Sequence, residues 1–203
     1  MKLAYSATSP YVRKVMVLLH ETGQLDDVAL TEIATTPMAP SAPLVSQNPL
    51  GKVPALERDE GPALFDSRVI CAFLDDRAQA GLYGKGARHW EIRTLEATAD
   101  GILDAALLMV YETRLRDEDE RSEAWVEAQW AKIAQAVAAL NTRWISHLSG
   151  TLDMGQIAVG CALGYVDFRH DARGWRKGNE ALADWYKTFD SRPSMQATAP
   201  PQG

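Results

Sequence analysis

The chain has 203 residues, of which 46% are hydrophobic and 24% are charged, and its net charge is −6. This composition excludes intrinsic disorder and predicts a globular protein of one large domain or two small ones. The acidic balance argues against a general binder of nucleic acids or anionic membranes, because such surfaces repel a negative protein at long range.

Residues 1–78 have the pattern of a small mixed sheet covered by helices. A short apolar run leads into Ser9-Pro10, which opens an amphipathic helix, and alternation over residues 28–33 predicts a second strand. The right-handed crossover rule restricts how these two strands can be placed. The expected elements are a strand at 2–6, a helix from 10, a strand at 28–33, a loop with a single helical turn at 35–48, strands at 53–58 and 63–65, and a helix at 67–78.

Residues 79–87 include three glycines and predict a linker between domains at 1–78 and 88–203. Beyond the linker, apolar residues recur every three or four positions over 88–115 and 130–144, which is typical of amphipathic helices. No charged residue lies between Asp153 and Asp167, so we expect Ile157 to Val166 to form a helix that is buried on every side. With a last helix at about 180–190, the second domain is predicted to be all helical.

Asp153 and Gln156 have the spacing of a capping box at the start of the buried helix. We expect the Asp153 carboxylate to accept hydrogen bonds from backbone N–H groups. The Gln156 side chain should reach back to the cap residue.

The chain lacks the signals of a membrane or secreted protein. No segment approaches the roughly 20 apolar residues that a membrane span needs, and the start at Met1 leads into a strand rather than a signal peptide. Cys71 and Cys161 lie in apolar helical patterns without metal-ligand spacing. We therefore expect a cytoplasmic protein with buried thiols and no metal site.

The turn at Ser9 is the first candidate for chemistry. Ser9 stands at the N-cap position and Pro10 at the first helical position, so a plain helix cap is one interpretation. However, the turn follows a strand, so the helix N–H groups and the positive end of its dipole point at whatever lies above Ser9. A thiol bound there, with the hydroxyl donating to its sulfur, would have a lowered pKa and act as a nucleophile.

Two further segments of the first domain suit an amino-acid or peptide ligand. Pro54 begins a strand, so it is either an edge-strand proline or a cis proline that turns the backbone of Val53 outward to pair with an extended peptide. Lys52 is either a solvated surface residue or a partner for a carboxylate. Asp66-Ser67 repeats the strand-to-helix turn, with Ser67 expected to cap the next helix, and is either a plain helix cap or a seat for both ends of an α-amino acid.

In their order and spacing, these segments resemble the glutathione transferase superfamily, over nearly the full length of the chain. Residues 9–15 (SPYVRKV) resemble the active-site turn of its serine-type bacterial and plant members, and residues 48–56 (NPLGKVPAL) resemble its cis-proline segment. Residues 65–67 (FDS) resemble the γ-glutamyl clamp. Residues 153–169 and 192–194 resemble the buried helix and the chain end of its second domain.

The resemblance implies a thioredoxin-like, α/β glutathione-binding domain followed by an all-α substrate-binding bundle, in a homodimer without a metal. Ser9 would donate to the glutathione thiolate, and Val53 would pair with the cysteinyl backbone. Lys52 would meet the glycine carboxylate, while Asp66 and Ser67 hold the γ-glutamyl end. Asp100 resembles an acidic residue that family members present to the γ-glutamyl group of the partner subunit.

The sequence departs from the family pattern at two places. The clamp more often reads Glu-Ser, so Asp66 reaches one carbon less far. The buried helix usually opens with Ser or Thr and has Asp three residues on, whereas this chain exchanges the partners as Asp153 and Gln156. Neither departure changes the expected fold.

Serine rather than cysteine at position 9 bears on the reaction. A serine cannot form a mixed disulfide, so the sulfur chemistry is left to glutathione, which favours conjugation or peroxide reduction. By helical spacing, a pocket for a small hydrophobic electrophile is expected near Ala105, Leu108, Met109 and Glu112, although core packing explains the apolar positions equally well. Trp175 and the basic run 173–177 are expected at the surface.

Other functions remain open on this scaffold. One is a non-catalytic module for protein interactions, against which the intact set of glutathione contacts argues. Another is a glutathione-dependent isomerase, reductase or ether-cleaving enzyme, which only substrate assays separate from a transferase.

Overall fold

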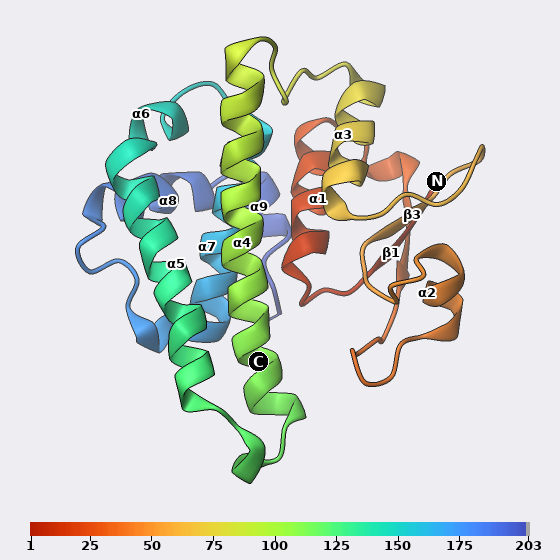
Figure 1. The fold of residues 1–203 in the computed structure, drawn as a ribbon. Helices are drawn as coiled ribbons and strands as arrows, with labels where there is room; N and C mark the ends of the chain where they lie inside the picture. The colour runs from red at the N-terminus through yellow and green to blue at the C-terminus, as the bar shows by residue number, and fades with distance from the viewer. Residues whose placement is uncertain (202–203) are drawn as a thin grey trace. The chain divides into compact units, whose positions relative to one another are not determined.

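The computed structural model describes residues 1–201, and contacts within the chain divide it into two compact units (Figure 1). The first unit comprises Met1–Tyr83 together with residues 193–201, and the second comprises Gly84–Arg192. None of the helices formed by residues 1–201 combines the length and the apolar character needed to cross a membrane.

The first unit is built on a three-stranded sheet. Its central strand, β1 (Lys2–Tyr5), pairs in parallel with β2 (Ala29–Glu32) and antiparallel with β3 (Ala55–Glu57). The fourth strand expected at 63–65 is reduced to one bridge, in which Leu56 and Leu64 exchange two hydrogen bonds of 2.9 Å. The helix that begins at Ser67 follows this bridge closely and leaves little chain for further pairing.

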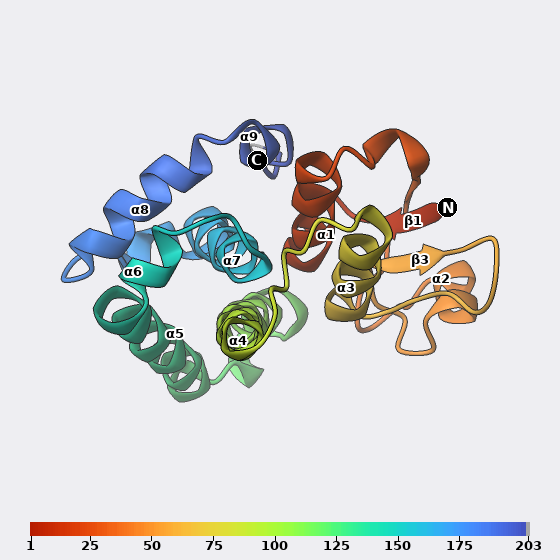
Figure 2. The same ribbon diagram turned by 90° about the horizontal axis from the view of Figure 1, so that it is seen from above.

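Helices cover both faces of this sheet, as Figure 2 shows: α1 (Pro10–Glu21) and α3 (Ser67–Ala78) lie together on one side and α2 (Ala42–Gln47) on the other. Ala4 and Ala55 pack with Leu44 of α2. Side chains alternate along a strand, so the fully buried Leu3 and Leu56 point to the opposite face, toward α1 and α3.

The short helix α9 (Pro193–Ala197) packs on α1 within the first unit. The guanidinium of Arg13 donates to the carbonyl of Met195 at 3.0 Å, and Ser194 donates to Glu21. The sequence pattern groups this segment with the helical domain predicted at 88–203, because a chain end carries no signal of which unit it will contact.

The second unit contains only helices and irregular segments. Its helices are α4 (Ala87–Leu115), α5 (Glu123–Arg143), α6 (Ile145–Leu148), α7 (Met154–His170) and α8 (Glu180–Asp190), with the 3-10 turns η2 (Glu118–Glu120) and η3 (Asp171–Arg173). In α7 every residue from Met154 to Val166 is buried, as its lack of charge predicted. A Cβ atom on Gly155 would lie 2.9 Å from the Cβ atom of Leu95, so glycine lets α7 approach α4 closely.

The expected fold class is therefore confirmed: a small mixed sheet covered by helices, followed by an all-helical unit. The boundaries of the linker predicted at 79–87 stay a prediction.

Candidate functional site

The strand register brings the candidate residues of the first unit to one end of the sheet. Because β3 is antiparallel to β1, with Ala55 opposite Ala4, the start of β3 and the end of β1 lie at the same end. The bridge from Leu64 to Leu56 directs the following residues, 65–67, back to this end as well. The turn before α1, the residues before β3 and the start of α3 therefore converge there.

Ser9 is the N-cap residue of α1. Its Oγ accepts a hydrogen bond from the N–H of Val12 at 3.3 Å, and Pro10 occupies the first turn. The backbone N–H of Ser9 donates to the carbonyl of Ser6 at 3.0 Å, which closes the turn after β1. Because Oγ acts as the acceptor toward the helix, the hydroxyl proton can be donated to a group outside it.

Val53 lies just before β3, and its peptide bond to Pro54 is cis. Its half-buried side chain packs against the small core that includes Ala4 and Leu44. Its backbone N–H and C=O form no hydrogen bond with any residue in the range 1–201. They can therefore pair with an extended ligand strand.

Asn48 holds the loop that leads to Val53. It is 2% exposed, donates from Nδ2 to the carbonyl of Lys52 at 2.8 Å and accepts from the N–H of Leu50 at 3.0 Å. Gly51 has a φ of +62°, and a Cβ atom there would lie 2.8 Å from that of Pro40. The sequence reasoning gave Asn48 and Gly51 no role, although an Asn followed by Pro, Leu and Gly is a turn signal.

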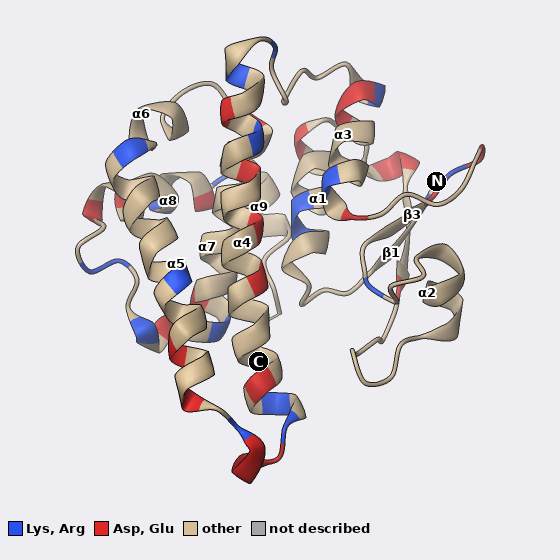
Figure 3. Ribbon diagram, viewed as in Figure 1, with Lys and Arg blue, Asp and Glu red and all other residues tan. Residues whose placement is uncertain are grey.

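Lys52 is exposed and is the first charged residue after Glu32. Figure 3 shows the same feature: α2 and the chain around it, residues 33–51, carry no Lys, Arg, Asp or Glu. Lys52 therefore supplies an isolated positive charge at this end of the sheet.

Asp66, not Ser67, is the N-cap of α3, which corrects the sequence interpretation. Its Oδ1 accepts from the N–H of Arg68 at 3.0 Å, and its Oδ2 lies 3.6 Å from Nε of Arg68, with both side chains about half exposed. Ser67 is the buried first residue of the helix. Asp and Ser side chains can both cap a helix, and here Asp66 does so because it directly precedes the first helical residue. The Phe65–Asp66 bond is also cis.

The candidate residues of the second unit lie along α4, and most are buried. Asp100, Ala105 and Met109 are at most 3% exposed, whereas Leu108 is 41% exposed. The carboxylate of Glu112 accepts from the N–H of Ser122 at 2.9 Å and pairs with Arg116 at 3.1 Å, so it fastens the end of α4 to the start of α5. An electrophile pocket at these positions, and the contribution of Asp100 to a partner subunit, stay predictions.

Asp153 caps α7, with Oδ1 accepting from the N–H of Gln156 at 3.1 Å. Its Oδ2 accepts from Arg88 and His147, each at 2.8 Å. The predicted return bond from Gln156 to the cap residue does not form. Instead its Nε2 donates to the carbonyl oxygens of His147 in α6 and of Gly150 and Thr151 in the following loop, at 3.1–3.4 Å.

Trp175 is buried, contrary to the expectation of a surface residue. It is 4% exposed, and its Nε1 donates to Asp167 of α7 at 2.7 Å. Arg176 lies over its ring, 4.5 Å from the centroid. The bond to Asp167 depends on how the segment after α7 folds back on that helix, so the basic composition of 173–177 did not indicate the burial of Trp175.

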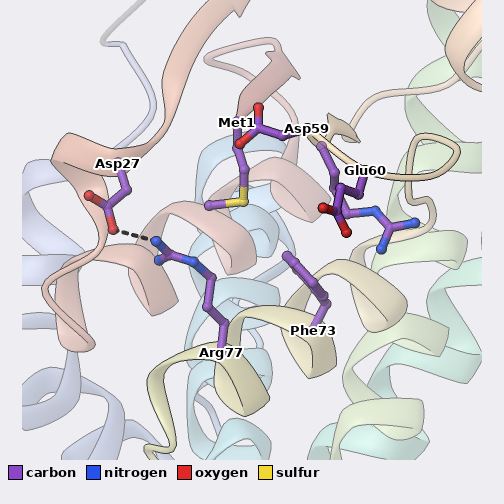
Figure 4. Close-up of a pocket in the computed structure, with 7 residues that line it drawn as sticks. Met1, Asp27, Asp59, Glu60, Phe73 and Arg77 are labelled. Carbon is purple, nitrogen blue, oxygen red and sulfur yellow. Dashed lines mark hydrogen bonds and ion pairs between the residues drawn. The ribbon is translucent and has the colours of Figure 1, made fainter.

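A hollow of about 470 Å³ lies at the opposite end of the sheet, next to the start of β1 (Figure 4). Its walls mix both signs of charge, and Arg77 points to Asp27 across a 2.8 Å ion pair. Arg58 lies over the ring of Phe73, 5.5 Å from its centroid. None of the candidate residues lines this hollow. Residues 1–201 also contain no group of three or more His, Cys, Asp or Glu side chains placed to hold a metal ion.

The chain matches two protein-family models, "Glutathione S-transferase, N-terminal domain" over residues 8–77 and "Glutathione S-transferase, C-terminal domain" over residues 123–188. It is 34% identical to the uncharacterized GST-like protein YibF of Escherichia coli (strain K12), over the full length of both chains.

Two solved structures are also similar over almost the whole chain. A glutathione transferase family member from Pseudomonas fluorescens Pf-5, with bound glutathione, is 48% identical, covers 99% of both chains and has a TM-score of 0.96. A glutathione S-transferase from Methylobacillus flagellatus KT, with glutathione bound, is 33% identical over 98% of this chain and 99% of its own, with a TM-score of 0.85.

Proposed function

Because this chain belongs to the glutathione S-transferase family, we propose that it is an enzyme that binds glutathione on its α/β unit and uses the glutathione thiolate as a nucleophile. The resemblance found in the four sequence segments is thereby confirmed, as is the thioredoxin-like plus helical fold. The activity itself, its location in the cytoplasm and assembly as a homodimer are parts of the proposal.

The observation that carries the proposal is the position of Ser9. Its hydroxyl caps α1 as an acceptor and retains a proton to donate, at the positive end of a twelve-residue helix. A thiolate above this turn receives one charge-assisted hydrogen bond and a favourable dipole, and both lower the pKa of the bound thiol. Ser9 is therefore the proposed catalytic residue.

The remaining groups at this end of the sheet match the other parts of glutathione. We assign the backbone of Val53 to the cysteinyl residue and Lys52 to the glycine carboxylate. Asp66 and Ser67 are assigned to the γ-glutamyl end. Asp100 is assigned to the γ-glutamyl end of the glutathione bound by the partner subunit. The solved relatives that contain glutathione support a complete tripeptide site.

The proposed reaction follows from the thiolate. The sulfur lone pair forms a C–S bond to an electrophilic carbon, and the leaving group departs with its bonding electrons or, in an addition, the adjacent carbon takes up a proton. With a peroxide, the thiolate attacks oxygen and releases an alcohol. The resulting sulfenic acid then condenses with a second glutathione to give the disulfide and water.

The electrophile is assigned to the helical unit, near Ala105, Leu108, Met109 and Glu112. The structure of the Pseudomonas fluorescens Pf-5 family member with bound S-(propanoic acid)-glutathione, 46% identical to this chain, supports a site that accepts a substituent on the sulfur.

Two measurements on the purified protein test this function. We expect retention on immobilised glutathione, release by glutathione in solution, and turnover of chlorodinitrobenzene or an organic hydroperoxide. Retention without turnover of any electrophile, peroxide or disulfide would favour a binding module. A failure to bind glutathione at millimolar concentration would overturn the proposal.

A further inference from the structure

Two arginines near the ends of α4 and α7 have no acidic partner among residues 1–201. Arg114, in the last turn of α4, and Arg169, near the end of α7, form no ion pair with any residue in the range 1–201. Three carboxylates on α4, α5 and α7 pair with other cations, in Glu112–Arg116 at 3.1 Å, Glu127–Arg173 at 2.7 Å and Asp167–Arg176 at 2.6 Å. Although the chain has a net charge of −6, these two guanidinium groups give this part of the helical unit a local positive charge.

Arg169 is positioned by its own helix. Its guanidinium lies over Phe168, 3.9 Å from the ring centroid, and Phe168 in turn lies 6.4 Å from the ring of Tyr165. The Nε atom is buried and has no hydrogen-bond acceptor among residues 1–201. A buried N–H without an acceptor costs free energy, which a bound oxygen would offset.

Tyr111 and Arg114 face the same region from α4. They are three residues apart and therefore lie on one side of that helix. His170 fastens the end of α7 to α4, because its Nε2 lies 2.9 Å from the carbonyl oxygen of Ala106. Leu107, one turn before Tyr111, and the exposed Leu108 extend the surface with apolar atoms.

The pKa of Tyr165, on α7, is influenced by residues of both α4 and α7. Burial is the largest influence on its pKa and raises it, whereas the positive charge of Arg169, a hydrogen bond from it and the charge of Arg114 lower it. Tyr111 also acts on the pKa of Tyr165, and its own pKa is raised by burial. Both phenols therefore keep their protons at neutral pH and can donate hydrogen bonds.

We propose that Tyr111, Arg114, Tyr165 and Arg169 form an anion-recognition cluster that binds a carboxylate on the electrophilic substrate. The substrate class is then a short or aromatic electrophile with an acidic group, its apolar part lying toward Leu107, Leu108 and Phe168. Guanidinium groups match carboxylate geometry, and phenol donors complete the coordination. This inference rests on the proposed transferase function and adds the chemical class of its second substrate.

The most direct test compares two conjugates that differ only in one group. S-carboxyethylglutathione and S-propylglutathione differ by a carboxylate in place of a methyl group, and their affinities can be measured by calorimetry. We expect Arg169→Gln to weaken binding of the carboxyethyl conjugate by about tenfold, while binding of the propyl conjugate changes by less than about twofold. Arg143→Gln is the control, because Arg143 likewise forms no ion pair with residues 1–201 but is exposed and lies at the far end of α5.

Turnover provides a second readout. For a chloronitrobenzoate and its neutral carboxamide, Arg169→Gln should lower kcat/KM for the acid alone, and Arg169→Lys should restore part of it. If Arg169→Gln does not fold by circular dichroism, Arg114→Gln takes its place with the same expected selectivity. Equal losses for charged and neutral ligands, or no loss, would overturn the inference while leaving the transferase function intact. Failure of both conjugates to bind the unaltered protein would instead overturn the function on which it rests.

Discussion

At the scale of single residues, the proposed glutathione site depends on Asn48, a residue to which we assign no contact with the ligand. Asn48 is buried and joins the backbone at Leu50 to that at Lys52, so it determines the path of the chain directly before Val53. The backbone groups of Val53 therefore lie in a loop that is held by the hydrogen bonds of Asn48 rather than by strand pairing.

Replacing Asn48 should therefore affect both stability and glutathione binding. Asn48→Ala removes two hydrogen bonds in a buried position, and we expect a loss of about 2 kcal/mol in the free energy of unfolding. The KM for glutathione should rise, while that for the electrophile should change little. Asn141→Ala is the control, because Asn141 also accepts a backbone hydrogen bond, from Leu182, but in the helical unit. An equal rise of the glutathione KM in both variants would contradict the role of Asn48.

The residue scale is also where sequence reasoning failed most often. Asp66 and Ser67 can each cap a helix, and only the backbone geometry decides that Asp66 does so. Gln156 found acceptors in a loop that the capping-box pattern does not include. The burial of Trp175 depends on Asp167, a partner on another element.

At the scale of elements, α7 is the helix whose start is most strongly determined. Its cap residue, Asp153, is 2% exposed and accepts hydrogen bonds from a backbone N–H, from Arg88 on α4 and from His147 on α6. The cap therefore also joins three helices of the unit. The apolar remainder of α7 contributes to the core, but it does not determine where the helix starts.

We expect Asp153→Ala to cost about 3 kcal/mol, from the lost cap and from the buried partners left without a carboxylate. Ser122→Ala removes only the cap of α5, where Oγ accepts from Trp125 at 3.2 Å, and should cost about 1 kcal/mol. Urea unfolding of both variants, followed by circular dichroism, measures the difference. An equal loss in the free energy of unfolding for the two variants would show that the contacts of Asp153 with Arg88 and His147 do not stabilise the protein.

Elements with long periodic patterns were predictable, and short ones were not. The helices expected at 67–78 and 180–190 have those bounds in the structure, because apolar spacing and end signals agree there. By contrast, α6 and α9 span only four and five residues, too few to show a period. The fourth strand was overpredicted for the same reason, since a three-residue apolar run cannot reveal how many bridges it forms.

At the scale of the whole molecule, the two units divide the proposed chemistry. The α/β unit carries the groups assigned to glutathione at one end of its sheet, while the helical unit carries those assigned to the electrophile. The first set was predictable because its residues adjoin strand ends and helix starts, where motif spacing determines position. The residues of the anion-recognition cluster were not predictable, because Tyr111 and Tyr165 lie near each other only through the packing of α4 against α7.

The account depends most on Ser9, and the measurement that tests it is the pKa of the glutathione thiol bound to the protein. Ultraviolet titration of the thiolate should be carried out on the unaltered protein, on Ser9→Ala and on Ser122→Ala, which loses a comparable helix cap in the other unit. We predict that Ser9→Ala raises the pKa of the bound thiol by about 1–2 units, with little change in glutathione affinity, and that Ser122→Ala leaves this pKa unchanged. The same thiol pKa in all three proteins would contradict the account.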